Sequence, residues 1–352
     1  MTTTVPSFQV ETRVLADGYR IPRIVRGGWQ LAGDHGVVDR ERALADMAKF
    51  VDAGLNTADC ADIYAGVEDL YGEFNTRRAA DGLPRQQVHT KFVPDYGDLA
   101  IVDAAYVRRI VERSLQRLRV ERLDLVQFHW WDYTVPRFVE AAQALKALQQ
   151  EGLIAQLGGT NFDLPHTEIL LDAGVPLVSM QVQYSVLDQR PRALLASMCK
   201  KRGIQLLCYG TLAGGFLTER WLGLAEPVEA LSNRSLVKYK LIIDEFGGWT
   251  RFQSLLRALK CIADRHVVQL STVAIRWVLD QPAVAAAIVG ARYSNRISDT
   301  LEVFQLRLDA ADHALLDPIL TASPGPSGEP YGLERDKTGP HGRIMKYDLN
   351  KT

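Results

Sequence analysis

The sequence predicts an α/β protein with a closed (β/α)8 TIM barrel as its main body. Apolar runs alternate with helix patterns along the chain, and eight such units fit into about 300 residues, the size typical of this barrel. Most of the apolar runs lack an in-and-out alternation, which is typical of parallel strands covered on both faces. An open doubly wound sheet is the alternative, but the GxGxxG turn that it normally carries is absent from the sequence.

The first elements lie near the N-terminus. Asp17-Gly18 separates two short alternating runs, which predicts an N-terminal β-hairpin ahead of the barrel. The first barrel strand then ends in Gly27-Gly28. Glycines at a strand end leave no side chain, so we expect that a ligand can approach the backbone there.

The remaining elements follow in strict alternation. With the runs near Val25 and Thr57, the predicted strands are 87–92, 123–129, 154–162, 177–184, 204–212 and 284–289. Apolar stripes and stop residues such as Gly54 predict helices. They lie near 40–52, 67–78, 104–120, 135–150, 164–173, 192–202, 252–265 and 271–279.

Two stretches stand outside the repeat. Residues 218–250 form a long loop insertion after the seventh strand and carry several aromatic side chains. From residue 323 onward the chain is rich in glycine and proline, which predicts an irregular C-terminal tail. We therefore expect a single barrel domain over 1–322 and a tail over 323–352 that covers or flanks the barrel mouth.

Composition excludes several classes of function. The net charge is −1 and the charges are dispersed, so no basic block indicates a nucleic-acid partner. No apolar run is long enough to cross a membrane and the N-terminus lacks a signal-peptide pattern, so we expect a cytoplasmic protein without a membrane partner. The four cysteines show no metal-ligand spacing, so no metal is expected. The oligomeric state stays open, with a monomer favoured.

Polar side chains lie where three of the predicted strands end. Asp59 and Tyr64 follow one strand, and Lys91 and His129 end two later ones. Each of them alone is accounted for by packing, capping or solvation. Because parallel neighbours place these ends at one rim, however, Lys91 and Asp59 would be costly to bury without each other. A carboxylate, a phenol and an ammonium group at one rim suit proton-transfer chemistry.

Seven motifs at successive strand ends resemble those of the aldo-keto reductase superfamily, in the family's order. They cover nearly the whole barrel, from Gly27 to about Phe304. The motifs are Asn56-Thr57-Ala58-Asp59 through Tyr64, His89-Thr90-Lys91, Leu123-Asp124-Leu125 through His129, Gly159-Thr160-Asn161-Phe162, Gln181-Val182-Gln183-Tyr184-Ser185, Tyr209-Gly210-Thr211-Leu212-Ala213-Gly214-Gly215 and Val289-Gly290-Ala291-Arg292. The chain resembles the long branch related to potassium-channel β subunits more than the aldose reductase branch.

The resemblance implies a catalytic tetrad of Asp59, Tyr64, Lys91 and His129. A free tyrosine has a pKa of about 10 and is a reluctant acid at neutral pH. We expect Lys91, anchored by Asp59, to lower the pKa of Tyr64 so that the phenol gives its proton to the substrate oxygen. His129 would hydrogen-bond that oxygen and orient it.

The resemblance also implies a nicotinamide cofactor across the barrel mouth. Its expected contacts are Gly28, Thr160, Asn161, Gln181, Tyr209, Gly210, Leu212, Gly214, Gly290, Arg292, Arg296, Asp299 and Thr300. A guanidinium suits the 2′-phosphate of NADPH, so we expect NADPH rather than NADH. Two positions depart from the family: Asp299-Thr300 stands for the usual Glu-Asn, and Gly210-Thr211 for Ser-Pro.

We therefore expect an oxidoreductase that reduces an aldehyde or ketone with NADPH. Trp29, Trp130 and Trp131 would line or flank the pocket of this small-molecule carbonyl substrate and favour flat or apolar compounds, with core packing as the alternative for Trp131. Two other functions share the fold and cofactor. One is an accessory subunit that binds NADPH with little turnover, and the other is an alcohol or sugar dehydrogenase running in the oxidative direction.

Overall fold

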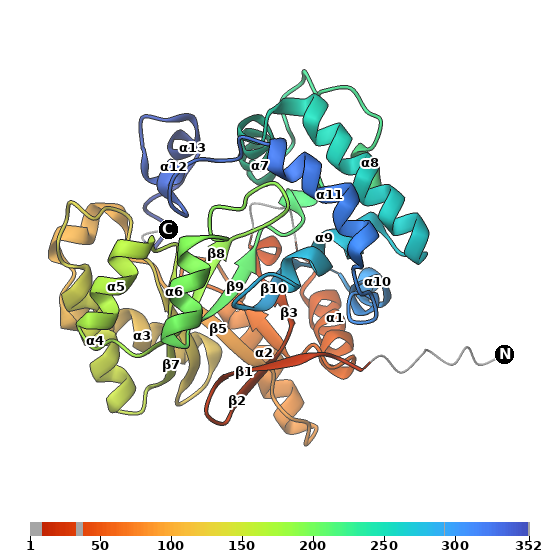
Figure 1. Ribbon diagram of the computed structural model, residues 1–352. Coiled ribbons are helices and arrows are strands. Elements are labelled where there is room, and N and C mark those ends of the chain that lie inside the picture. The colour runs from red at the N-terminus through yellow and green to blue at the C-terminus, as the bar shows by residue number, and fades with distance from the viewer. Residues whose placement is uncertain (1–8, 33–37, 292, 351–352) are drawn as a thin grey trace.

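A closed barrel of parallel strands forms the centre of the molecule (Figure 1). The computed structural model describes residues 9–32, 38–291 and 293–350. Strand order follows the chain, and the last strand pairs with the first to close the barrel. The eight strands are β3 (Ile24–Gly27), β4 (Thr57–Asp59), β5 (Gln87–Phe92), β6 (Leu123–Phe128), β7 (Ile154–Thr160), β8 (Leu177–Gln183), β9 (Gln205–Tyr209) and β10 (Val284–Gly290). The predicted (β/α)8 barrel is confirmed.

Helices surround the barrel, and aspartate side chains fix where several of them begin. Asp39, Asp103, Asp163 and Asp309 each accept a hydrogen bond from a backbone N–H in the first helical turn, the arrangement of an N-cap. The helices around the barrel are α1 (Arg40–Asp52), α2 (Val67–Ala80), α3 (Ala104–Leu118), α4 (Phe138–Gln150), α5 (Leu164–Asp172), α6 (Leu194–Arg202), α8 (Gly248–His266), α9 (Leu270–Leu279), α10 (Ile297–Glu302) and α11 (Ala310–Ala322).

The predicted N-terminal hairpin is present and closes one end of the barrel. Its strands are β1 (Thr12–Ala16) and β2 (Tyr19–Pro22). Leu15 and Ile21 pack against the apolar side chains inside the barrel. The Tyr19 hydroxyl lies 2.9 Å from Nε2 of the buried His89 on β5. The hairpin therefore covers the end of the barrel where the strands begin.

The insertion and the tail both lie at the other end of the barrel, where the strands end. The insertion contains a helix that the sequence did not predict, α7 (Arg234–Glu245), and the tail contains the short helices α12 (Gly332–Arg335) and α13 (Pro340–Arg343). Figure 1 shows these helices on the opposite side of the barrel from the β1–β2 hairpin. The mouth of the barrel is thus bordered by segments from distant parts of the chain.

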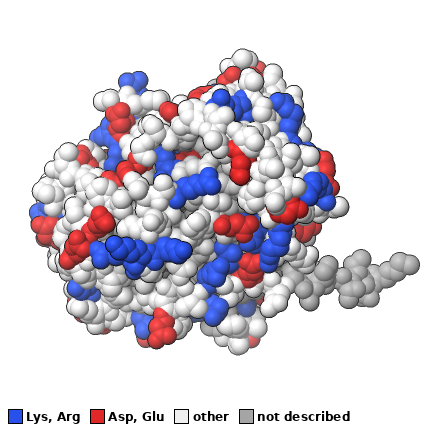
Figure 2. Space-filling view, viewed as in Figure 1, with Lys and Arg blue, Asp and Glu red and all other residues white. Residues whose placement is uncertain are grey.

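The surface has no dominant charge. In Figure 2 positive and negative side chains are interspersed over the visible face, as expected from a net charge of −1. Within the described residues, no helix combines the length and apolar character needed to cross a membrane.

Helices α2 and α3 meet at Gly72, which gives a test of the packing. A Cβ atom built on Gly72 would lie 2.1 Å from the backbone oxygen of Arg117. Gly72→Ala is therefore expected to lower the free energy of unfolding by about 1–3 kcal/mol, because the helices must separate. Gly332→Ala, where a built Cβ meets nothing within 4 Å, is the control. Equal urea midpoints for the two variants would contradict this contact.

Candidate active site

A buried ion pair lies where β4 and β5 end. Lys91 Nζ is 2.7 Å from Asp59 Oδ2 and donates a second hydrogen bond of 2.6 Å to the backbone oxygen of Cys60. Lys91 and Asp59 are 7% and 4% exposed. Removing either charge from such a pair leaves the other one buried and uncompensated, which is costly. The two groups predicted to need each other are therefore in contact.

Two glutamine side chains hold the second oxygen of this carboxylate. Asp59 Oδ1 accepts hydrogen bonds from Gln127 Nε2 (3.0 Å) and Gln181 Nε2 (2.6 Å), and Gln181 Nε2 also lies 2.8 Å from Gln127 Oε1. Gln181, predicted to contact the cofactor, thus has its amide nitrogen turned to Asp59. Gln127 was not predicted, although a polar residue within the apolar strand 123–128, two residues before His129, was a usable signal.

Tyr64 lies beside the ion pair. Lys91 Nζ is 5.3 Å from the centroid of its ring, and the ring of Trp29 is 5.0 Å from it on another side. Burial, followed by the charge of Asp59, raises the pKa of Tyr64 well above 10. The expected lowering of this pKa by Lys91 is therefore not found. The reason is that burial, the larger cause, disfavours the charged phenolate, and the negative charge of Asp59 adds to this effect.

His129 lies in a dry, aromatic surrounding. Its Nδ1 is 3.3 Å from the backbone oxygen of Thr160, whereas its Nε2 is enclosed by protein and has no hydrogen-bond partner. The rings of Trp131 and Tyr331 meet it edge-on at 4.4 and 5.4 Å. Burial, and then the charge of Arg335, lowers the pKa of His129 to about 3. The lowered pKa favours the neutral imidazole near neutral pH.

The three tryptophans predicted to line or flank the substrate pocket differ in position. Trp29 is partly exposed and contacts Tyr64. Trp130 is 0% exposed, packs against Phe128, and donates its indole N–H to backbone oxygens of its own loop. Trp130 is thus a core residue, and Trp131 is the tryptophan that borders His129.

Residues predicted to hold the cofactor lie at the ends of β7 and β9. Thr160 is 2% exposed, and the Tyr209 hydroxyl donates to Asn161 Oδ1 at 2.9 Å. Gly210 and Gly214 have left-handed backbones, with φ of 72° and 64°. A Cβ at either one would lie 2.5–2.8 Å from the Tyr239 side chain on α7. Close packing against α7 thus already requires glycine there, and the adjacent Leu212 is half-buried.

Other predicted contacts lie after β3 and β10. Gly28 is buried, and a Cβ there would lie 2.7 Å from Asp59 O, so strand packing requires glycine. Gly290 and Arg296 are exposed, whereas Arg292 lies outside the described residues. In α10, Thr300 Oγ1 donates to Arg296 O at 2.8 Å. The backbone oxygen of the preceding residue, Asp299, accepts from Thr272 Oγ1 at 3.4 Å.

A buried charge cluster, which the sequence did not predict, joins α7 and the tail to the barrel. Arg190 lies 2.7 Å from Asp188 and 3.3 Å from Glu334, and Lys238 lies 3.6 Å from Glu334. Although burial alone would raise the pKa of Glu334, Lys238 and Arg190 hold it at about 2. Lys238 Nζ is also 5.2 Å from the Tyr209 ring. These four charges balance one another.

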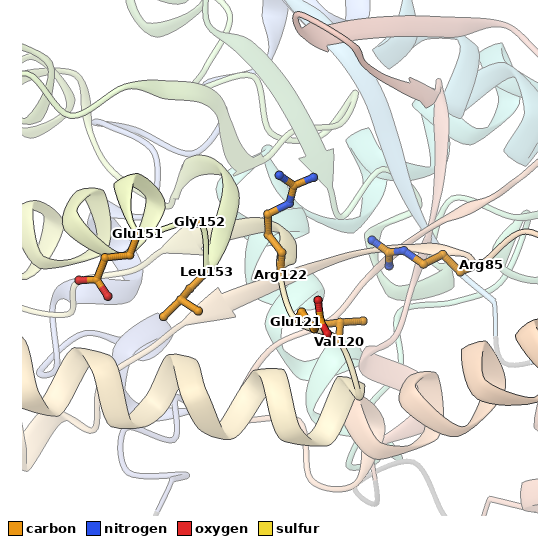
Figure 3. Close-up of a pocket in the computed structure, with 7 residues that line it drawn as sticks. All are labelled: Arg85, Val120, Glu121, Arg122, Glu151, Gly152 and Leu153. Carbon is orange, nitrogen blue, oxygen red and sulfur yellow. The ribbon is translucent and has the colours of Figure 1, made fainter.

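Two other features lie away from this site. A hollow lined by Arg85, Val120, Glu121, Arg122, Glu151, Gly152 and Leu153 lies at the amino ends of the strands (Figure 3). Active sites of such barrels lie at the carboxyl ends. His266, Asp309 and Asp312 lie within 4.8 Å of one another, but Arg265 pairs with both carboxylates, which accounts for the cluster without a metal.

Comparison with known proteins agrees with the barrel. The sequence model described as the Aldo/keto reductase family matches residues 23–321. The chain is 30% identical over 276 residues to flagellar radial spoke protein 5 of Chlamydomonas reinhardtii, covering 67% of this chain and about half (51%) of that protein. It is 27% identical over 321 residues to the aldo-keto reductase YhdN of Bacillus subtilis, covering 88% and 93% of the two chains.

The solved structures give the same result. The glycerol dehydrogenase of Gluconobacter oxydans matches with a TM-score of 0.75 and 26% identity, covering 92% of this chain and 98% of that one. An aldo-keto reductase of Klebsiella pneumoniae in complex with NADPH matches in fold, with a TM-score of 0.67 at 21% identity over 91% and 97% of the chains. The chain therefore belongs to the aldo/keto reductase family and is an oxidoreductase.

Proposed function

We propose that this protein reduces an aldehyde or ketone to an alcohol with NADPH, using Tyr64 as the general acid. The observation that carries the proposal is the buried Asp59–Lys91 pair under the Tyr64 ring, with the unpartnered His129 Nε2 at the same end of the barrel. Buried ionisable groups gathered at the carboxyl ends of the strands of a barrel are typical of catalytic sites.

Each group at the site has a separate role in the proposed reduction. The bound cofactor supplies the hydride for the carbonyl carbon. Tyr64 gives its proton to the oxygen, and its raised pKa keeps the phenol protonated until then. The transfer is favourable because a developing alkoxide is a stronger base than phenolate. Lys91 then stabilises the phenolate, and Asp59 holds the ammonium group in place.

His129 positions the substrate oxygen. A neutral imidazole has one N–H donor, and 3.3 Å to Thr160 O is long for an N–H···O hydrogen bond. Because Thr160 O can only accept, this long contact weakly favours a proton on Nδ1, so donation to the carbonyl requires the Nε2–H form, which gives up the contact. In an enclosed site such a donor stabilises the charge that develops on oxygen.

The residues fit a nicotinamide dinucleotide, the cofactor that aldo/keto reductases use as NADH or NADPH. Arg296 is exposed and, within the described part of the chain, forms no ion pair. A Cβ built on Gly215 meets nothing within 4 Å, which leaves room beside the loop after β9. A relative from Escherichia coli, 25% identical over 320 residues, is named an NADH-specific methylglyoxal reductase, so family membership alone does not fix the cofactor. The proposed preference for NADPH therefore depends on Arg296.

Titration of Arg296→Ala tests this preference. Loss of one charge-assisted hydrogen-bonding group is expected to weaken NADPH binding about tenfold to a hundredfold. NADH binding should stay nearly unchanged, because NADH lacks the 2′-phosphate. Arg307→Ala, which removes an exposed arginine paired with Glu11, controls for loss of surface charge. Equal weakening of the two cofactors would contradict the role of Arg296.

We also propose that residues 323–350 cover the barrel mouth. This rests on Tyr331 against His129 and on Arg335, which donates to the backbone oxygens of Trp130 and Asn161 at 3.0 and 2.8 Å. The tail thus ties the loops after β6 and β7 together.

Steady-state assays of the purified protein test the function as a whole. NADPH oxidation with a panel of aldehydes and ketones is the expected activity, and NADPH binding without any turnover would favour an accessory subunit. The likeness to a glycerol dehydrogenase favours alcohol oxidation as a second candidate. In that direction the tyrosinate accepts the alcohol proton, so the ratio of the two rates at saturating cofactor separates them.

A further inference from the structure

Arg335 in the tail helix α12 is a cation at the mouth that has no carboxylate partner among the described residues. Its Nη2 donates to the backbone oxygens of Trp130 and Asn161. Its Nε and Nη1 are enclosed by protein and have no hydrogen-bond acceptor. Enclosed N–H groups of a guanidinium are costly to leave unpaired, so their presence needs an explanation.

Three other cations near this end of the barrel are paired. Lys91 lies on Asp59, while Arg190 and Lys238 share Asp188 and Glu334. No carboxylate in the described ranges lies within ion-pair distance of Arg335. Arg335 therefore contributes a positive charge without an ion-pair partner close to His129, the residue proposed to hold the carbonyl oxygen.

The surroundings of Arg335 limit what it can bind. The guanidinium carbon lies 4.2 Å from the centroid of the Tyr133 ring and 5.3 Å from that of the Tyr331 ring. The Tyr331 ring also meets His129 at 5.4 Å, so a group bound here is only a few carbon atoms from the carbonyl. One free positive charge matches one carboxylate. A phosphate monoester carries about −1.5 to −2 and would leave excess negative charge among the rings.

We propose that Arg335 binds a carboxylate of the substrate, and that the substrates are oxo acids with the carboxylate close to the carbonyl. This rests on the reaction proposed above and names its substrate class. Arg335 is a specificity residue: it holds one end of the substrate, His129 holds the carbonyl oxygen, and Tyr64 supplies the proton. Tyr331, in contact with both Arg335 and His129, limits the length of the acid.

Paired substrates test the proposal. Pyruvate and 4-oxopentanoate are compared with their methyl esters, which keep the carbonyl and remove the charge. Each pair is assayed with the wild type, Arg335→Met, Arg335→Lys and the control Arg137→Met. Arg137 also donates to a backbone oxygen, that of Ala100, on an exposed surface. The readout is the ratio of kcat/KM for acid over ester, which cancels general damage to the site.

Wild type should prefer the acids, and Arg335→Met should lower the ratio about tenfold to a hundredfold, the loss expected for one charge-assisted contact. Arg335→Lys should keep part of the preference, and Arg137→Met all of it. A wild type that prefers esters, or a ratio unchanged in Arg335→Met, would overturn the proposal.

A binding measurement distinguishes failure of the proposed reductase activity from failure of the proposed carboxylate site. If the folded wild type turns over no carbonyl, calorimetric titration of the NADP-bound protein with pyruvate replaces the kinetic readout. Binding by wild type that weakens about tenfold in Arg335→Met keeps the carboxylate site. Equal binding by both proteins rejects it.

Discussion

Tyr64→Phe is expected to lower kcat about 10²- to 10⁴-fold, the range that general acid catalysis supplies. Phenylalanine keeps the ring that packs on Trp29 and lies over Lys91, and removes only the hydroxyl that carries the proton. NADPH affinity and the urea midpoint should therefore stay nearly unchanged. Stopped-flow measurement of hydride transfer separates this loss from slow product release.

Tyr71→Phe is the matched control for this prediction. Tyr71 is also buried, and its hydroxyl has no hydrogen-bond partner. Removing that hydroxyl should leave turnover unaffected. Retained turnover in Tyr64→Phe, or equal loss in both variants, would refute the role of Tyr64 as the acid.

The pH dependence of kcat/KM in the wild-type protein tests the roles of His129 and Tyr64. The pKa of His129 is lowered to about 3, so no rise or fall of kcat/KM between pH 5 and 8 is expected from it. The pKa of Tyr64 is raised, so its acid form persists through neutral pH and reduction slows only as alkaline pH removes the proton. A limb near pH 6.5 that disappears in His129→Gln would show instead that the imidazole titrates.

Asp59→Asn is expected to cause the largest loss of stability, about 3–5 kcal/mol, because it leaves the buried Lys91 without a counter-charge. Whichever way the asparagine amide is turned, its NH2 group faces a donor: Lys91 at one oxygen position, or Gln127 and Gln181 at the other. Turnover should fall together with stability.

The double variant Asp59→Asn/Lys91→Met separates charge from packing. Removing both charges should recover much of the lost stability, since it removes the uncompensated ammonium group. The double variant should still be inactive, because no cation remains to stabilise the phenolate of Tyr64. Urea denaturation followed by circular dichroism measures the recovery. Single and double variants of equal stability would show that the ion pair contributes nothing.

The barrel was predictable from the sequence because each strand–helix unit has a local pattern. Asp59, Lys91 and His129 lie at the ends of buried strands, and parallel strands place their ends at one rim, so their convergence followed from the fold. Helix α7 was missed because 218–250 was interpreted by its aromatic content as a loop. Arg335 and Glu334 lie in a stretch rich in glycine and proline, and their partners lie about 100 to 200 residues away, so no local pattern indicated them.

Position in the sequence also failed to distinguish two adjacent tryptophans. Both Trp130 and Trp131 follow β6, and only the direction of the loop turns one into the core and the other toward His129. The pKa of Tyr64 was misjudged for a similar reason. The sequence shows which charges are near, whereas the degree of burial decides which of them dominates.

The pairing of β10 with β3 has a consequence for biosynthesis. The sheet cannot close until residue 290 has left the ribosome, so the barrel folds as a whole near the end of translation and depends on contacts between the two ends of the chain. A truncated product that stops before Val284 exposes the unpaired edges of β3 and β9, which invites association with other chains. Premature termination should therefore yield aggregates rather than a partly active enzyme.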